Sequence, residues 1–276
     1  MGKVLKIWII AVGIFCFGVT KVVSQTKVTQ IAELFMERTH VSQQKDTLHY
    51  RLLKPLDYDP NKQYPLVVCL SGGAGRGRDN IKQIAGSKAA QVLSTLENRK
   101  KYPALIFVPQ CPPGADWGRS PGKSEKERLM ARGRYNQPNV EALVFETIAA
   151  LEEEFNIDSS RRYITGQSMG GYGTWHYILS RPHIFAAAIP ICGGGNPELA
   201  KNIADIPLWV FHGDKDNTVP VDFSRNMVAA IKKAGGNPKY TEFPDVGHSS
   251  WHPAFDTQEL LDWLFAQVKE REAEDR

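Results

Sequence analysis

The sequence predicts an α/β domain built on a largely parallel β-sheet with helices on both faces. Short β-rich runs alternate with amphipathic helical patterns, and several of these runs are almost uninterrupted in their hydrophobicity. Such alternation is typical of βαβ units, and strands that are covered on both faces lose the polar–apolar alternation of a half-exposed sheet. With 276 residues and 42% hydrophobic content, the chain is long enough for one such domain.

Seven segments are expected strands because they are short and rich in β-branched, aromatic or other apolar residues: 47–53, 65–70, 104–109, 162–165, 187–192, 207–211 and 240–243. Three longer segments have the amphipathic spacing of helices: 140–155, 223–234 and 257–269. In the first of these, Leu143, Ile148 and Leu151 fall on one stripe. The second is followed by Gly235 and Gly236, which provide a helix stop.

Two stretches depart from this rhythm. Residues 25–45 form a polar lead-in that is either an added edge strand or a flexible arm. Residues 111–139 are rich in Pro, Gly and charge and are long for a connection in a compact domain. They are either a functional loop over the site or a surface excursion with a short helix near 125–131.

The first 24 residues have the pattern of an export signal. Lys3 and Lys6 precede an apolar run at 7–19, and residues 22–24 suit a signal peptidase. The run is too short to span a bilayer, although an uncleaved anchor is the alternative. We therefore expect a secreted or periplasmic protein with no stable membrane association after cleavage. Its parts would be the signal (1–24), the lead-in (25–45), an α/β domain (46–270) and a charged tail (271–276).

Charge and cysteine content exclude several functions. Loss of Lys3, Lys6 and Lys21 with the signal lowers the formal net charge from +4 to about +1, and no basic stripe remains, so nucleic-acid binding is not expected. No His, Cys or Asp cluster has ligand spacing, so the sequence predicts neither a metal nor an organic cofactor. Outside the signal there are three cysteines: Cys69, Cys111 and Cys192. This odd, widely spaced set favours buried free thiols.

The most specific motif is the pentapeptide from Gly166 to Gly170, which fits G-x-S-x-G around Ser168. It directly follows an expected strand and precedes a helix-like stretch, which is the context in which such a serine is a nucleophile on a sharp turn. The following helix would direct its N–H groups toward developing negative charge. The alternative is that Ser168 only caps that helix.

A serine nucleophile needs a histidine base and a carboxylate that orients it, and in this architecture they follow in the order Ser, Asp, His. Asp216 and His248 come just after the expected strands 207–211 and 240–243, at the sheet edge where such folds gather their chemistry. Asp214 is the rival carboxylate and is expected to cap the turn instead. His252 is the rival base, and His212 is expected to be structural.

The negative oxygen of a tetrahedral intermediate needs N–H donors. One would be the backbone N–H of Met169, the residue after the nucleophile. The second would come from the Gly-rich loop at 71–75, where Gly73 is the candidate. This loop also suggests a phosphate cradle, but it lacks the Gly-Lys-Ser/Thr ending of a P-loop.

From about residue 50 to 265 the chain resembles the α/β-hydrolase superfamily. It is most similar to the secreted esterases and predicted peptidases that group with phospholipase/carboxylesterase, feruloyl or acetyl-xylan esterase, and prolyl oligopeptidases. The matching pieces are 56–60 with 64–68, the loop ending at Asp79-Asn80, 108–112, 166–175, 212–220 and Gly247-His248. The resemblance implies a mostly parallel sheet of about eight strands, with Ser168, Asp216 and His248 as a triad and Gly73 with Met169 as the oxyanion hole. One departure is Ser71-Gly72, where relatives usually carry His-Gly.

These observations predict a secreted serine hydrolase that cleaves carboxylic esters through an acyl-enzyme. Its substrate would be a small-molecule or oligosaccharide ester, with acyl groups on polysaccharides as one class that would fit. Trp117, Tyr172 and Trp251 are either stacking surfaces for that substrate or core residues. The alternatives are a serine peptidase of the prolyl oligopeptidase type and a catalytically inactive binding protein with this fold. The sequence leaves the oligomeric state open.

Overall fold

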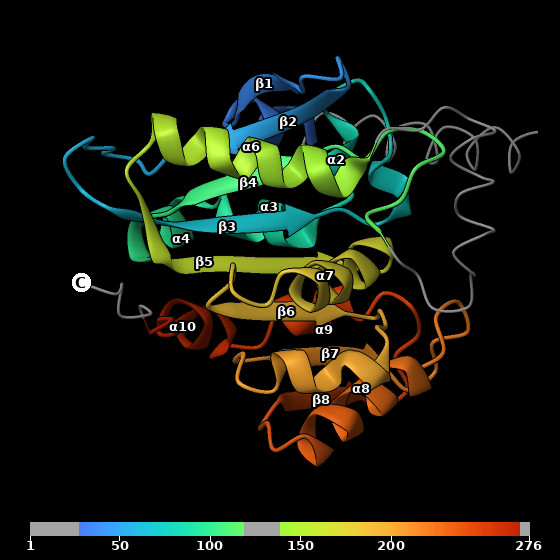
Figure 1. The fold of residues 1–276 in the computed structure, drawn as a ribbon. Helices are drawn as coiled ribbons and strands as arrows, with labels where there is room; N and C mark the ends of the chain where they lie inside the picture. The colour runs from blue at the N-terminus through green and yellow to red at the C-terminus, as the bar shows by residue number, and fades with distance from the viewer. Residues whose placement is uncertain (1–27, 119–138, 271–276) are drawn as a thin grey trace, which may run out of the picture.

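The computed structural model describes residues 28–118 and 139–270 (Figure 1). The expected signal, the helix expected near 125–131 and the tail at 271–276 lie outside the described residues. Residues 28–33 begin the described chain as a short helix. No helix in the described ranges is long and apolar enough to cross a membrane.

The eight strands of the described residues belong to one sheet, whose spatial order is β1-β2-β4-β3-β5-β6-β7-β8. The strands are β1 (Met36–Val41), β2 (Thr47–Leu53), β3 (Tyr64–Leu70), β4 (Leu105–Pro109), β5 (Ile157–Gln167), β6 (Ala187–Ile191), β7 (Trp209–Gly213) and β8 (Lys239–Phe243). The pairs β1–β2 and β2–β4 are antiparallel, and the remaining neighbours are parallel. In Figure 1 the arrowheads of β3, β6 and β7 point the same way. The predicted mostly parallel sheet is confirmed.

Each of the seven expected strands has a counterpart, and the eighth is β1. It pairs in register with β2, from Met36 opposite Leu52 to Val41 opposite Thr47. Of the two interpretations of 25–45, the added edge strand therefore holds for 36–41. Strand β5 is longer than the predicted 162–165 because it pairs with β3 on one side and β6 on the other.

The two faces of the sheet carry separate hydrophobic cores, as alternation along a strand requires. Leu66 and Val68 of β3 belong to the core that also contains buried side chains of α6 (Val140–Glu154), α7 (Met169–Ser180) and α8 (Asp222–Lys233). Val67 and Cys69 face the other way, toward α3 (Lys88–Leu93), α9 (Trp251–Phe255) and α10 (Leu260–Phe265). Helices therefore cover both faces, as predicted (Figure 1).

The helices between β3 and β4 were not predicted. They are α2 (Lys82–Ala85), α3 and α4 (Leu96–Lys101), and each has only four to six residues. Such lengths are too short for a periodic signal. Side-chain caps show instead where two of them begin: Ser87 accepts from Ala90 N, and Thr95 accepts from Asn98 N.

The expected helix at 257–269 is wrong in extent. Only α10 is helical within it, and the chain leaves the helix after Phe265. The reason is tertiary: Lys269 N donates to Ser160 O at 2.9 Å, and the Tyr163 hydroxyl donates to Gln267 O at 2.7 Å. These bonds hold the segment against β5 instead of letting the helix continue. Two 3-10 helices, η1 (Gly73–Gly75) and η2 (Pro197–Ile203), complete the elements in the part of the chain that the structure describes.

Candidate active site

Ser168 lies on the tight turn between β5 and α7. Its backbone has φ 55°, in the left-handed region that residues other than glycine rarely adopt. The flanking glycines are needed for close approach: a Cβ at Gly166 would meet Gly170 O, and a Cβ at Gly170 would meet Leu70 O. Backbone packing on both sides therefore requires the G-x-S-x-G pattern and leaves the Ser168 side chain half-buried at the sheet edge.

Three side chains from three loops meet at this turn. His248 Nε2 lies 2.8 Å from Ser168 Oγ, and His248 Nδ1 lies 2.8 Å from Asp216 Oδ2. An ionised carboxylate only accepts hydrogen bonds, so Nδ1 carries the proton of a neutral imidazole and Nε2 is free to accept from the serine hydroxyl. The structure thus brings together the three residues that the sequence singled out, in the geometry that general-base chemistry requires.

The loops that carry Asp216 and His248 are tied to each other through backbone hydrogen bonds. Asp214 N donates to Phe243 O at 3.1 Å, and Lys215 N donates to Val246 O at 3.0 Å. These bonds continue the parallel pairing of β7 and β8 beyond the strand ends. The carboxylate and the imidazole therefore approach each other because their strands are neighbours.

Asp216, and not Asp214, caps the turn after β7. Asp214 was expected to cap the turn, but among the described residues its buried Oδ1 has no hydrogen-bond partner, and its Oδ2 lies 3.8 Å from Lys215 Nζ. Asp216 caps the turn with its second oxygen: Oδ1 accepts from Thr218 N at 2.8 Å and Val219 N at 2.9 Å. Burial raises the pKa of Asp216, but the bonds from His248 and these two amides outweigh it and hold the pKa below its ordinary value.

His212 contacts the same carboxylate, which the sequence reasoning missed. The imidazole is fully buried, and its Nε2 donates to Val219 O at 2.9 Å while lying 3.2 Å from Asp216 Oδ2. Its Nδ1 lies 2.7 Å from the Ser224 hydroxyl. Burial lowers the pKa of His212, which keeps the ring neutral at pH 7. The alternative base, His252, is exposed on α9 instead.

Cys192 lies directly behind Ser168. It follows β6 with φ 40°, is fully buried, and its Sγ accepts a hydrogen bond from Ser168 N at 3.3 Å. Burial raises the pKa of this thiol to about 12, so it is neutral at pH 7 and a weak nucleophile. Cys69 and Cys111 are likewise buried, and all three described cysteines are free, as the sequence predicted.

The opposite side of the site is the loop after β3, which contains Gly73 at the start of η1. Trp117 supports this loop: it is 1% exposed, and its Nε1 donates to Ser71 O at 2.8 Å. Of the two interpretations of Trp117, the core residue therefore holds. Arg76 Nε donates to Ala115 O at 2.6 Å and joins the loop to the same segment.

A buried polar network shapes the far end of this loop. Gln110, which follows β4 and is 1% exposed, accepts from Asn80 N at 2.7 Å and donates to Asp79 Oδ1 at 2.8 Å. Arg51 of β2 donates to Asn80 O at 2.6 Å. Burial raises the pKa of Asp79, but bonds from the N–H groups of Lys82 and Ile81 and from Gln110 outweigh it and hold the pKa well below its ordinary value.

The other two aromatic candidates are partly exposed near the triad. The Trp251 ring is perpendicular to the His248 imidazole, with 5.4 Å between ring centroids. Tyr172, on the first turn of α7, packs edge-on against Phe223 at 6.1 Å. Both therefore remain available as substrate contacts.

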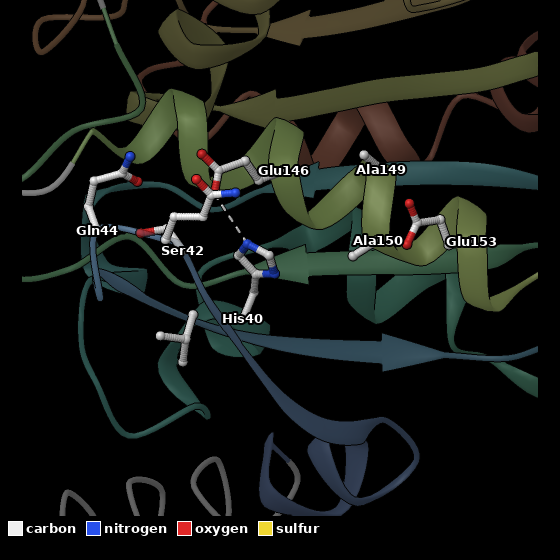
Figure 2. Close-up of a pocket in the computed structure, with 9 residues that line it drawn as sticks. His40, Ser42, Gln44, Glu146, Ala149, Ala150 and Glu153 are labelled. Atoms are coloured by element: carbon white, nitrogen blue, oxygen red, sulfur yellow. Dashed lines mark hydrogen bonds and ion pairs between the residues drawn. The ribbon is translucent and has the colours of Figure 1, made fainter.

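A separate depression of about 450 Å³ lies between the β1–β2 turn and α6. Figure 2 shows His40 pointing toward Glu146 of α6, with Nε2 and Oε2 3.3 Å apart. Apart from Val41, its walls are polar or small side chains, among them Ser42, Gln44 and Glu153. No residue of the candidate site lines it, so it has no part in the chemistry at Ser168.

The sequence matches two family models and several curated proteins. The family model described as "Putative esterase" matches residues 42–232, more than half of the chain, and that of the prolyl oligopeptidase family matches 196–271. "Probable feruloyl esterase C" of Aspergillus niger is 25% identical over 210 residues, which are 73% of this chain and 67% of the relative. "Uncharacterized peptidase YuxL" of Bacillus subtilis is 21% identical over 234 residues, which are 72% of this chain and 33% of the relative.

Among solved structures, a thermostable esterase superimposes with a TM-score of 0.79 and 39% sequence identity. The match covers 87% of this chain and 64% of that chain. The chain thus spans about a third of the Bacillus relative and somewhat under two thirds of the solved esterase.

Proposed function

The chain belongs to the esterase family of α/β-hydrolases, and from this premise we propose that it hydrolyses carboxylic esters with Ser168 as the nucleophile. The observation that carries the proposal is the line of two 2.8 Å contacts from Asp216 through His248 to Ser168. Side chains that meet in this order activate a hydroxyl that is otherwise a weak nucleophile.

The reaction would proceed in two halves. As Ser168 Oγ attacks the ester carbonyl, His248 Nε2 takes its proton, and Asp216 stabilises the imidazolium that forms. The backbone N–H groups of Met169 and Gly73 would bind the oxyanion. Collapse of the intermediate gives the acyl-enzyme while His248 protonates the departing alkoxide. Water, deprotonated by His248, then attacks the acyl group and releases the acid and Ser168.

The substrate would be a small-molecule or oligosaccharide ester. The Aspergillus relative is named a feruloyl esterase, which makes aromatic acyl groups on polysaccharides a reasonable class to test first. The half-buried rings of Tyr172 and Trp251 support this choice because aromatic faces stack on such groups.

A serine peptidase is the second candidate function. The prolyl oligopeptidase model matches 196–271, which includes Asp216 and His248, and the Bacillus relative is named a peptidase. The same triad would cleave an amide if the leaving amine were bound. The third possibility, an inactive binding protein, is disfavoured because all three reacting groups lie within hydrogen-bonding distance.

We further propose that the protein is exported, with residues 1–24 removed as a signal. The catalytic domain would then extend from about residue 46 to 270, with β1 added to the edge of its sheet. N-terminal sequencing of the protein recovered from the culture medium or periplasm tests this. An intact N-terminus in the membrane fraction would contradict it.

A substrate panel tests the proposed activity. It comprises p-nitrophenyl acetate, methyl ferulate, feruloylated and acetylated oligosaccharides, and short proline-containing peptides, each assayed with wild type and Ser168→Ala. We expect ester cleavage that the variant loses, together with fluorophosphonate labelling of wild type alone. Peptide cleavage well above ester cleavage would favour the second candidate, and wild type that neither turns over nor labels would favour the third.

A further inference from the structure

Two residues of the triad also belong to a cluster of side chains that could bind a metal ion. Cys192, Asp216 and His248 follow β6, β7 and β8, and the parallel pairing of these neighbouring strands brings residues from distant parts of the sequence to one edge. One ligand atom of each, a sulfur, a carboxylate oxygen and an imidazole nitrogen, lies within 4.8 Å of the other two. Within 28–118 and 139–270 this is the one group of its kind.

The spacing is close to what a tetrahedral ion needs. Bonds of about 2.0 to 2.3 Å separate the ligands of such an ion by roughly 3.3 to 3.8 Å, so side-chain shifts on the order of 1 Å would close the set. The Ser250 hydroxyl lies beside the Cys192 thiol and is fully buried.

We infer that Cys192, Asp216 and His248 form an inhibitory site for thiophilic divalent cations such as Zn²⁺ and Cd²⁺. The inhibition rests on the proposed function, because two of the three ligands are the proposed base and its carboxylate partner. Thiolate and imidazole ligands select Zn²⁺ and similar ions, whereas Mg²⁺ and Ca²⁺ require oxygen ligands.

Binding would change the tautomer of His248. The cation takes the position between His248 Nδ1 and Asp216 Oδ2, where the proton now lies. The thiol proton of Cys192 is released to solvent, and the imidazole proton moves from Nδ1 to Nε2. The nitrogen that faces Ser168 Oγ is then a donor and no longer accepts the hydroxyl proton. Inhibition follows without any change at the serine itself.

Inhibition curves with a matched cysteine control test the inference. We would titrate wild type, Cys192→Ser and Cys69→Ser with Cd²⁺ during p-nitrophenyl acetate hydrolysis, with Mg²⁺ in parallel and chelator added at the end. We expect chelator-reversible inhibition of wild type by Cd²⁺ and not by Mg²⁺. Cys192→Ser should need at least about tenfold more Cd²⁺, and Cys69→Ser, whose thiol is buried elsewhere, should match wild type. Equal sensitivity of Cys192→Ser and wild type would overturn the inference.

Ultraviolet difference spectra give a readout that does not depend on turnover. Cd²⁺–thiolate charge-transfer absorption should appear in wild type and in Ser168→Ala, but not in Cys192→Ser or, should that variant fail to fold, Cys192→Ala. If wild type hydrolyses no ester and takes no fluorophosphonate label, the proposed function fails, while the spectra still decide whether the cation binds. Absence of the band in wild type refutes the site even if the enzyme is active.

Discussion

The two sides of the candidate site are built in different ways. On the β5–β8 side, the proposed reacting groups are side chains. Ser168, Asp216 and His248 are joined by two 2.8 Å contacts. On the β3–β4 side, the proposed donor of Gly73 is a backbone group, and buried side chains such as Gln110 and Trp117 shape the loop that presents it. A substitution on the β5–β8 side therefore removes a proposed reacting group, whereas one on the β3–β4 side removes a side chain that supports the loop.

This difference predicts how strongly a substitution on each side should lower activity. Removing a reacting side chain abolishes a chemical step, whereas removing a support displaces a backbone donor that the loop partly holds by other bonds. For example, Gly72 N still donates to Gly86 O at 2.9 Å, and Gly77 N to Cys111 O at 3.0 Å. Substitutions should therefore lower activity most on the β5–β8 side.

The largest effect is expected at His248. His248→Ala removes the base, and kcat should fall by about 10⁴-fold or more, as for other triads. His252→Ala is the matched control, because this neighbouring histidine is exposed and should change kcat less than about threefold. Steady-state kinetics on p-nitrophenyl acetate measures both. Loss of activity confined to the His252 variant would reverse the assignment of the base.

A smaller effect on the same side is expected at His212. The amide of His212→Asn reaches only the Nδ1 position beside Ser224, whereas that of His212→Gln reaches the Nε2 position beside Asp216. Losing the Nε2 N–H, which donates to Val219 O and lies 3.2 Å from Asp216 Oδ2, should lower kcat of the Asn variant about 10- to 100-fold, and Gln should restore most of it. KM should stay constant because His212 is fully buried. Equal kcat values in the two variants would show that the contact with Asp216 has no role.

On the β3–β4 side, the sharpest test replaces the amide N–H donor of Gln110 with a carboxylate acceptor. Gln110→Glu keeps the acceptor for Asn80 N but places a carboxylate against Asp79. We expect kcat to fall about tenfold as the loop shifts, since even complete loss of an oxyanion donor costs about 100- to 1000-fold.

A second substitution in the same chain, Asp79→Asn, offers an amide to the new carboxylate at position 110 and should recover part of that loss. Asp79→Asn alone serves as the control for the single change. If the double variant is no faster than Gln110→Glu, the network does not act on kcat through this pair.

The smallest effect on activity is expected at Trp117. Trp117→Phe leaves Ser71 O without its indole donor and opens space in the core. The free energy of unfolding should fall by about 2 kcal/mol, seen in urea unfolding, while kcat changes only a few-fold. A loss of activity as large as that of His212→Asn, with unchanged stability, would instead place the indole in direct contact with substrate.

Much of the site was predictable because its signals are local. The tight turn at Ser168 needs glycine on both sides, and polar residues that follow buried strands mark the catalytic edge of the sheet. The short helices α2, α3 and α4 escaped prediction, because capping and packing of a few residues define them. The end of the helix at Phe265 escaped prediction as well, since hydrogen bonds between residues 267–269 and β5 override the helical pattern there.

Local patterns were thus enough to predict the fold class and to single out the candidate residues, since turn and strand propensities act over a few residues. Only the tertiary structure decided which side chains contact one another. Ser168 and His248 are 80 positions apart in the chain, and the thiol of Cys192 and the second imidazole at His212 join them only because β5, β6, β7 and β8 are neighbours. Side-chain contacts across adjacent strands depend on sheet order and register, which no single segment encodes.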